Sequence, residues 1–331
     1  MVKKWEYSLA GRPLILETGK FAKQANGSVL IRYGDTAVLV TAVASTRPRE
    51  GIDFFPLLVD YEERLYAVGK IPGSFLRREG RPPESAILAA RTIDRPLRPL
   101  FPEGFRNDVQ VVATVLSVDP DNPTETTAMI GASIALMISD IPFKGPIAGV
   151  HVGRVDGKLI INPTMKQAEK SDMDVVVAGT KDAIMMVEAG AKEVMEEEIL
   201  EAILFGHEEI KKLVEFQEKI TKEIGKPSIE VELFEPDPQV IEMVKDFAYQ
   251  KIASALKTAE KLEREALIEQ VKEETNEYFK EKLGEEEYTE KVRDLNEALD
   301  IIIKDEVRRM ITEDHIRFCG RSSLRTLMPY I

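Results

Sequence analysis

The chain has 331 residues, a formal net charge of -13 at pH 7 and a hydrophobic fraction of 44%. This length suits about two domains, and the composition is that of a soluble globular protein rather than a disordered or fibrous one. The one cysteine, Cys319, excludes an internal disulfide and favours a reducing compartment. A protein this acidic has no overall field that attracts nucleic acid, so any such contact requires a local basic patch.

The N-terminal segment carries basic residues with no apolar stretch behind them, so we expect no secretory signal. No apolar run reaches the roughly 18 residues that a membrane span needs. We therefore expect a cytoplasmic protein without membrane partners.

Residues 1–228 predict one α+β domain. Runs rich in β-branched residues predict strands at 14–16, 28–33, 36–45, 54–61, 109–118, 147–155, 159–161, 174–178 and 184–188. Asp156-Gly157 predicts a hairpin between two of them. A helix over 127–139 is apolar nearly all round and should be buried, whereas one over 195–224 is amphipathic.

The composition changes after Pro236, where Glu and Lys become dominant and Pro and Gly nearly disappear. Apolar residues at helical spacing predict an all-helical domain over 237–312, with about three helices and a break at Gly284. Residues 318–331 have neither helical nor strand periodicity, and we expect a divergent tail over 313–331.

A basic segment, Ile71–Phe105, interrupts the first domain of this acidic chain. Its first part should be a loop that projects Phe75, because Pro and Gly break any regular element. From Pro83 onward an apolar stripe predicts a helix. The candidate RNA-binding side chains of the segment are Phe75, Arg77, Arg78, Arg81, Arg91, Arg95 and Arg98.

Guanidinium groups match phosphate geometry and an aromatic ring can stack on a base, so this segment suits a single-stranded nucleic acid. The alternative is ordinary ion pairing of the arginines with Glu79, Glu84 and Asp94. Spacing alone leaves both interpretations open.

Several common kinds of site are missing from the sequence. It has no GxxxxGK[ST] phosphate loop and no GxGxxG after a strand. The histidines, at 151, 207 and 315, have no ligand spacing and suggest structural roles, and Cys319 is a poor candidate nucleophile. Asp172 and Asp174 lie two apart at a strand entrance and could hold Mg²⁺ or Mn²⁺, although solvated side chains are the favoured interpretation.

Residues 1–312 resemble the N-terminal part of the bacterial polynucleotide phosphorylase (polyribonucleotide nucleotidyltransferase) family. The resemblance rests on stretches that follow one another in the family's order. They are GRPLILETGKFAKQANGSVLIRYGDTAVLVTAV, VGKIPGSFLRREGRPPE, TIDRPLRPLFPEGFRNDVQVVATVLSVD, AMIGASIALMISDIPFKGPI and MVEAGAKEVMEEEILEAILFGHE.

The resemblance implies a first ribonuclease-PH-like core (ribosomal protein S5 domain 2-like) followed by a small all-α domain. Full-length members add a second core and KH and S1 domains, and they form homotrimeric rings. In them inorganic phosphate, as co-substrate, attacks the 3′ end of single-stranded RNA with Mg²⁺ or Mn²⁺ and releases nucleoside diphosphates. This activity serves mRNA degradation, and an RNA-degradation complex is a possible partner. We expect no metal bound to this part alone.

The resemblance also implies roles for individual residues. Phe75, Arg77, Arg78 and Arg81 would grip RNA at a channel mouth, and Leu76 replaces a second aromatic residue of the family's motif. The positions equivalent to the catalytic residues of the second core are Ala168, Asp174 and Val176, of which only the aspartate is retained. The loop equivalent to the phosphate-binding serines carries Glu125, which would repel phosphate. We therefore expect no catalytic residue in this chain.

The second core should begin near Ile316, and the residues that follow do not fit it, so we expect a truncated or frame-shifted product. One hypothesis is that the chain is the N-terminal portion of a phosphorolytic exoribonuclease that is active only at full length. Another is a non-catalytic RNA-binding and ring-forming module. A complete single-core enzyme of the ribonuclease PH type is the third, but Ala168, Val176 and the helical domain argue against it.

Overall fold

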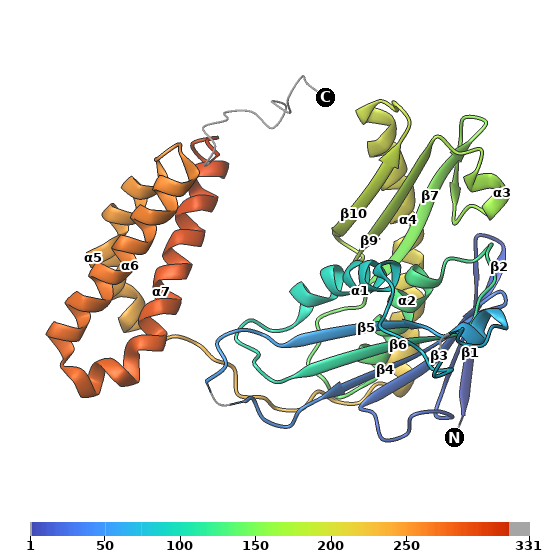
Figure 1. The fold of residues 1–331 in the computed structure, drawn as a ribbon, viewed down its shortest axis with the longest axis horizontal. Coiled ribbons are helices and arrows are strands. Elements are labelled where there is room, and N and C mark those ends of the chain that lie inside the picture. The colour runs from blue at the N-terminus through green and yellow to red at the C-terminus, as the bar shows by residue number, and fades with distance from the viewer. Residues whose placement is uncertain (1, 50, 74, 318–331) are drawn as a thin grey trace. The chain divides into compact units, whose positions relative to one another are not determined.

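The computed structural model describes residues 2–49, 51–73 and 75–317, and the chain divides between Leu233 and Phe234 into two compact units (Figure 1). Of the predicted tail over 313–331, the part from 318 onward, with Cys319, lies outside the described residues. No helix in the described ranges is long and apolar enough to cross a membrane.

The first unit contains two sheets. The larger has the order β1-β2-β3-β4-β6-β5, and all its neighbours are antiparallel except β5 and β6. Its strands are β1 (Lys3–Leu9), β2 (Arg12–Thr18), β3 (Gly27–Tyr33), β4 (Thr36–Ala44), β5 (Leu57–Glu63) and β6 (Val109–Ser117). Alternate side chains of the central strands are buried, as a sheet with one face on the core requires.

The smaller sheet is antiparallel throughout, in the order β10-β9-β7-β8. Its strands are β7 (Ala148–Val155), β8 (Lys158–Ile161), β9 (Met173–Gly179) and β10 (Ile184–Ala191). The turn between β7 and β8 lies at Asp156 and Gly157, both with positive φ, as the sequence predicted for a tight hairpin.

Helices pack between the two sheets and on the smaller sheet. They are α1 (Glu84–Leu97), α2 (Thr124–Met137), the one-turn α3 (Met165–Ala168) and α4 (Glu196–Ile224), with the short 3₁₀ turns η1 (Leu65–Val68) and η2 (Arg98–Leu100). The helix α2 is buried on every side from Thr126 to Leu136, because it packs on β3 and β4 of one sheet and on β7 of the other. The long α4 covers β7 and β9 (Figure 1).

The second unit is a bundle of α5 (Pro238–Leu256), α6 (Lys261–Leu283) and α7 (Glu285–Thr312), each of which packs on the other two. Gly284, at φ 82°, separates α6 from α7 at the predicted break. Its core is separate from that of the first unit and includes Val244, Phe279 and Leu299.

The structure differs from the predicted elements in four places. β1 and α3 were not predicted, and α2 begins at Thr124 rather than 127. The strand expected from Phe54 begins only at Leu57. The Phe55 ring packs instead against Phe101 and Phe105, with centroids 4.7 and 5.5 Å away, so this apolar run serves an aromatic cluster before the strand starts.

Candidate nucleic-acid interface

The basic loop between η1 and α1 projects into solvent. Phe75 is 100% exposed and Leu76 is 71% exposed, which is unusual for large apolar side chains. Arg77 adopts a φ of 51°, a left-handed conformation that is uncommon for a residue with a Cβ atom. A carboxylate oxygen of Glu79 accepts a hydrogen bond of 3.0 Å from the Leu65 backbone and ties the loop to η1. The loop is thus anchored at its base and exposed at its tip.

The arginines of this loop are exposed side chains. Arg77, Arg78 and Arg81 are all accessible to solvent. Among the described residues, neither Arg77 nor Arg81 forms a side-chain hydrogen bond or ion pair. Glu79 is occupied by a backbone group, so the ion pairing considered as an alternative does not account for these two guanidinium groups.

The arginines on α1 and at its C-terminal end have three different environments. Arg98 is committed to the protein: it donates to Asp94 at 2.8 Å and to the carbonyl oxygens of Phe55 and Leu57 at 3.2 and 3.0 Å. These bonds join the end of α1 to the start of β5, which is a structural role.

Arg95 pairs with Glu188 of β10 at 2.5 Å and thereby connects α1 to the smaller sheet. Arg91 is exposed and has no side-chain partner among the described residues. Of the three predicted RNA contacts on this helix, Arg91 is therefore the best placed to meet an external anion.

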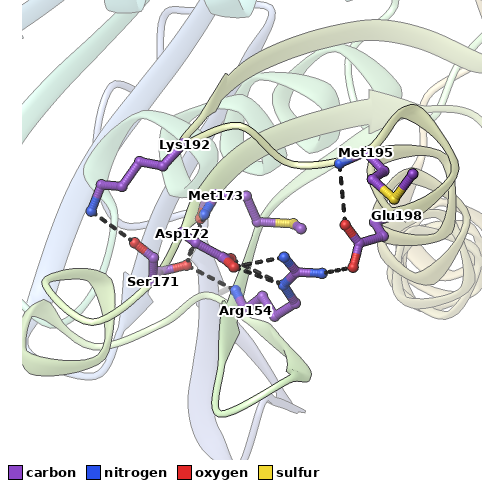
Figure 2. Close-up of polar contacts among 7 residues, drawn as sticks. All are labelled: Arg154, Ser171, Asp172, Met173, Lys192, Met195 and Glu198. Carbon is purple, nitrogen blue, oxygen red and sulfur yellow. Dashed lines mark hydrogen bonds and ion pairs between the residues drawn. The ribbon is translucent and has the colours of Figure 1, made fainter.

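Asp172, a candidate metal ligand from the sequence, belongs to a polar network that Figure 2 shows. Arg154 of β7 donates to the Asp172 carboxylate at 2.6 and 3.0 Å and pairs on its other side with Glu198 of α4. Ser171 accepts from the Arg154 backbone at 2.8 Å, and its carbonyl oxygen accepts from Lys192 at 3.2 Å. The hydrogen bonds from Arg154 hold the pKa of Asp172 below its ordinary value. This carboxylate thus fastens β7, the entrance to β9 and α4 together.

Asp174, the second candidate, faces a histidine. Its Oδ1 lies 3.1 Å from Nδ1 of His151, and Nε2 of the same ring lies 2.8 Å from Oε1 of Glu125. Burial disfavours the charged imidazole, but the bonds to Asp174 and Glu125 outweigh it and raise the pKa of His151 to about 9. Burial likewise opposes ionisation of Glu125, yet the His151 partner lowers the pKa of that carboxyl. The imidazolium is therefore shared between two carboxylates.

These groups adjoin a cavity of about 320 Å³ lined by His151, Asn162, Ala168, Met173 and Asp174, among others. Ala168 offers no ligand atom, and Val176 packs against the core. Among the described residues, no three Asp, Glu, His or Cys side chains are arranged to hold a metal ion. The carboxylates that line the cavity are those of Asp121, which accepts from the Met165 backbone at 2.9 Å, and Asp174, which is held by His151. Asp172 is not among the described lining residues and is held by Arg154, so the residues at this cavity do not fit a divalent cation.

Sequence reasoning did not foresee the role of His151. The strands β7 and β9 pair with His151 opposite Val176, which brings Asp174 beside the imidazole. The other histidines have simpler surroundings, since Nε2 of the buried His207 lies 3.0 Å from the carbonyl oxygen of Thr180, and His315 is exposed. Strand order, which spacing in the chain does not reveal, was the missing information.

Three family models match the chain. The "3′ exoribonuclease family, domain 1" covers residues 10–142 and "domain 2" covers residues 145–209, so their boundary falls between α2 and β7. The "Polyribonucleotide nucleotidyltransferase, RNA binding domain" covers residues 239–322.

Curated relatives match over nearly all of the chain. The polyribonucleotide nucleotidyltransferase of Heliobacterium modesticaldum is 61% identical over 313 residues, and that of Geobacillus kaustophilus is 60% identical over the same length. These matches include 95% of this chain but 43% of each relative, so the chain spans less than half of their length.

A solved structure shares the fold. The crystal structure of rice (Oryza sativa) Rrp46 aligns with a TM-score of 0.50 at 15% identity, over 67% of this chain and 94% of that one. The family models divide the chain into the same core and helical regions as the structure does. The chain belongs to the 3′ exoribonuclease family and corresponds to the N-terminal part of its polyribonucleotide nucleotidyltransferases.

Proposed function

We propose that this chain is the RNA-guiding part of a polyribonucleotide nucleotidyltransferase, a phosphorolytic 3′-to-5′ exoribonuclease that acts in mRNA degradation. In that reaction an oxygen of inorganic phosphate attacks the phosphorus of the 3′-terminal phosphodiester. The bond to the 3′ oxygen of the preceding nucleotide breaks, that oxygen takes a proton, and a nucleoside diphosphate leaves. The remaining RNA is one nucleotide shorter and ends in a free 3′ hydroxyl.

The observation that carries this proposal is the exposed loop around Phe75. A fully exposed aromatic ring beside Arg77 and Arg81 combines a stacking surface with cations that have no internal partner among the described residues. Stacking on a ring tolerates any base, and arginine contacts follow the phosphate backbone. This combination suits single-stranded RNA of any sequence. Arg78 extends the same surface, Arg91 follows on α1, and Arg95 and Arg98 support the helix through their protein contacts.

Catalysis is assigned to residues outside this chain. Here Ala168 and Val176 stand where the resemblance requires an aspartate and a lysine. Glu125 lies at the start of α2 and is paired with His151. It stands in the loop that the resemblance equates with the phosphate-binding serines, where its carboxylate would repel phosphate. Mg²⁺ or Mn²⁺ would belong to the site of the whole enzyme. The proposed setting is the cytoplasm, and the proposed assembly is a homotrimer within an RNA-degradation complex.

RNA binding tests the loop. We would measure binding of a fluorescent oligo(A) by anisotropy between low and physiological salt, for the wild-type chain and for the double variant Arg77→Gln with Arg81→Gln. Each lost phosphate contact lowers the slope of log affinity against log salt by about 0.7 for a single strand, so the double variant should lose about 1.4. Phe75→Leu should weaken binding without changing that slope.

The matched control removes two other exposed arginines of the first unit, Arg32 and Arg47, whose side chains have no partner among the described residues. If this control lowers affinity and slope as much as the loop variant, general charge accounts for binding and the loop assignment is wrong.

A phosphorolysis assay separates the guiding part from a complete enzyme. The chain would be incubated with poly(A) and phosphate, with Mn²⁺ in one sample and EDTA in another. We expect no release of ADP above the EDTA sample. Metal-dependent release that a substitution of Asp174 abolishes would instead establish a working site in this core.

A further inference from the structure

A second basic feature lies in the first unit, in a cavity of about 430 Å³. Its walls are the segment 19–26 that joins β2 to β3, and residues Ile138 and Ile224 at the C-terminal ends of α2 and α4. Volumes of this size are typical of small-molecule sites.

The wall of the cavity is firmly held. Asn26 donates to Asp140 at 2.8 Å and accepts from the Ala44 backbone at 3.1 Å. Gly27 lies so close to α2 that an added Cβ would be 1.9 Å from the carbonyl oxygen of Ala135. The cavity is therefore formed by the fold itself and does not require a ligand to order it.

The charge of the cavity is opposite to that of the chain. The ionisable side chains that line it are Lys3, Lys23 and Lys226, and no carboxylate is found among its described lining residues. Lys3 is paired with Glu223 at 3.0 Å. Lys226 donates to the carbonyl oxygen of Asn26 at 2.7 Å.

Lys23 is exposed and has no hydrogen bond or ion pair among the described residues. In a protein with a formal net charge of -13, such a concentration of lysines favours an anionic ligand.

An aromatic ring completes the set. Phe21 lines the cavity and is 39% exposed, and Nζ of Lys20 lies 5.2 Å from the centre of its ring. A half-exposed ring beside lysines can stack on a base while the ammonium groups meet phosphate. Inorganic phosphate alone would use only the lysines, so the ring favours a larger ligand.

We propose that this cavity binds a nucleotide, with the base on Phe21 and the phosphates on Lys23 and Lys226. The choice of a nucleotide rests on the proposed function, which supplies both RNA and nucleoside diphosphates; the anionic character of the site rests on the lysines alone. The bound nucleotide is either a free nucleoside diphosphate or one nucleotide of an RNA strand.

The test uses calorimetry with ADP and with inorganic phosphate on the whole chain. Lys23→Glu should weaken ADP binding about tenfold or more, because a charge-assisted hydrogen bond is replaced by repulsion. Lys158→Glu makes the same charge change at the exposed Lys158 of β8, outside the cavity, and should leave ADP binding unaltered. Phe21→Leu should weaken ADP about tenfold but not phosphate. Phe54→Leu, which removes another exposed ring, should affect neither.

The source of the nucleotide follows from oligo(A) binding. If Lys23→Glu weakens both ADP and oligo(A), the cavity holds a link of RNA; if it weakens ADP alone, the cavity holds a free nucleotide. The site is refuted if the wild-type chain binds no ADP at millimolar concentration, or if Lys23→Glu and Lys158→Glu weaken it equally. Neither result affects the proposal that the loop around Phe75 binds RNA, because Arg77 and Arg81 are tested separately with oligo(A). Circular dichroism confirms that each variant is folded.

Discussion

Alkaline pH should destabilise the first unit through the single side chain of His151. Its imidazole lies 2.8 Å from Glu125 and 3.1 Å from Asp174, and these bonds raise its pKa from 6.5 to about 9. The folded state therefore holds a proton that the unfolded chain releases at lower pH. The stabilisation is fully present below pH 6.5 and is lost as the pH rises through about 9.

The size of the effect follows from the two pKa values. The rise from 6.5 to about 9 corresponds to about 3 kcal/mol. Asp174 has a side chain that is 70% exposed, so solvent screens its part of the interaction. We therefore expect a loss of about 2 kcal/mol in the free energy of unfolding between pH 6.5 and 9.5. At acid pH the carboxyl of Glu125 controls the stability instead. Its pKa is lowered in the folded state, so it stabilises the fold above its ordinary pKa of 4.5, and this stabilisation is lost as the pH falls below that value.

The chain provides a specific reporter for this measurement. Trp5 is the one tryptophan of the sequence and lies on β1 in the first unit, where its indole donates to Glu223 at 2.9 Å. Urea unfolding followed by tryptophan fluorescence between pH 6 and 10 would give the free energy at each pH. His151→Gln should flatten the curve above pH 6.5, and it should cost stability at pH 6 because Glu125 loses its cation.

The double variant His151→Gln with Glu125→Gln should recover part of that loss at pH 6, since no buried charge is left unpaired. His207→Gln is the control, because His207 is a buried histidine bonded to a carbonyl oxygen rather than to carboxylates. The reasoning is refuted if His151→Gln loses as much stability as the wild type between pH 6.5 and 9.5.

Three further substitutions test a close backbone contact, an ion pair and the core of the helical unit. Gly27→Ala should cost more than about 4 kcal/mol, because its Cβ would lie 1.9 Å from the Ala135 oxygen; a thermal midpoint within a few degrees of wild type would contradict the close approach. Arg154→Met should return the pKa of Asp172 toward its ordinary range in an NMR titration, and no change would mean that Arg154 does not hold this carboxylate. Phe279→Ala should cost the helical unit about 3–5 kcal/mol, since this ring is 1% exposed. Circular dichroism should detect that loss while the Trp5 transition stays in place, and a shift of both would show that the two units unfold together.

Elements with a strong local signal could be predicted from the sequence. The all-round apolar pattern of α2 indicated a buried helix, and Gly284 indicated the break between α6 and α7. The family resemblance also identified the first core and the helical unit that follows it. β1 was missed although Trp5, Tyr7 and Leu9 alternate with polar residues along it. Its side-chain partners are not local, because Trp5 and Tyr7 donate to α4 some two hundred residues away.

The candidate site was predictable only where local sequence determines it. The exposed loop around Phe75 follows from local Pro and Gly residues, and the pairing of Arg98 with Asp94 follows from helical spacing. The partners of Asp172 and Asp174 depend on which strand lies beside β9. Arg154 and His151 reach them only because β7 pairs there, and no local pattern specifies that pairing.

The burial of α2 has a consequence for the synthesis of the protein. A helix without a polar face has no side that water can solvate favourably. The elements that pack on α2 leave the ribosome at different times. β3 and β4 precede it on the growing chain, but β7 and the end of α4 emerge later, the last of them about 90 residues after α2. At roughly 5–20 residues per second, one apolar flank of α2 is uncovered for several seconds on the ribosome. During that interval this segment is a natural ligand for a chaperone.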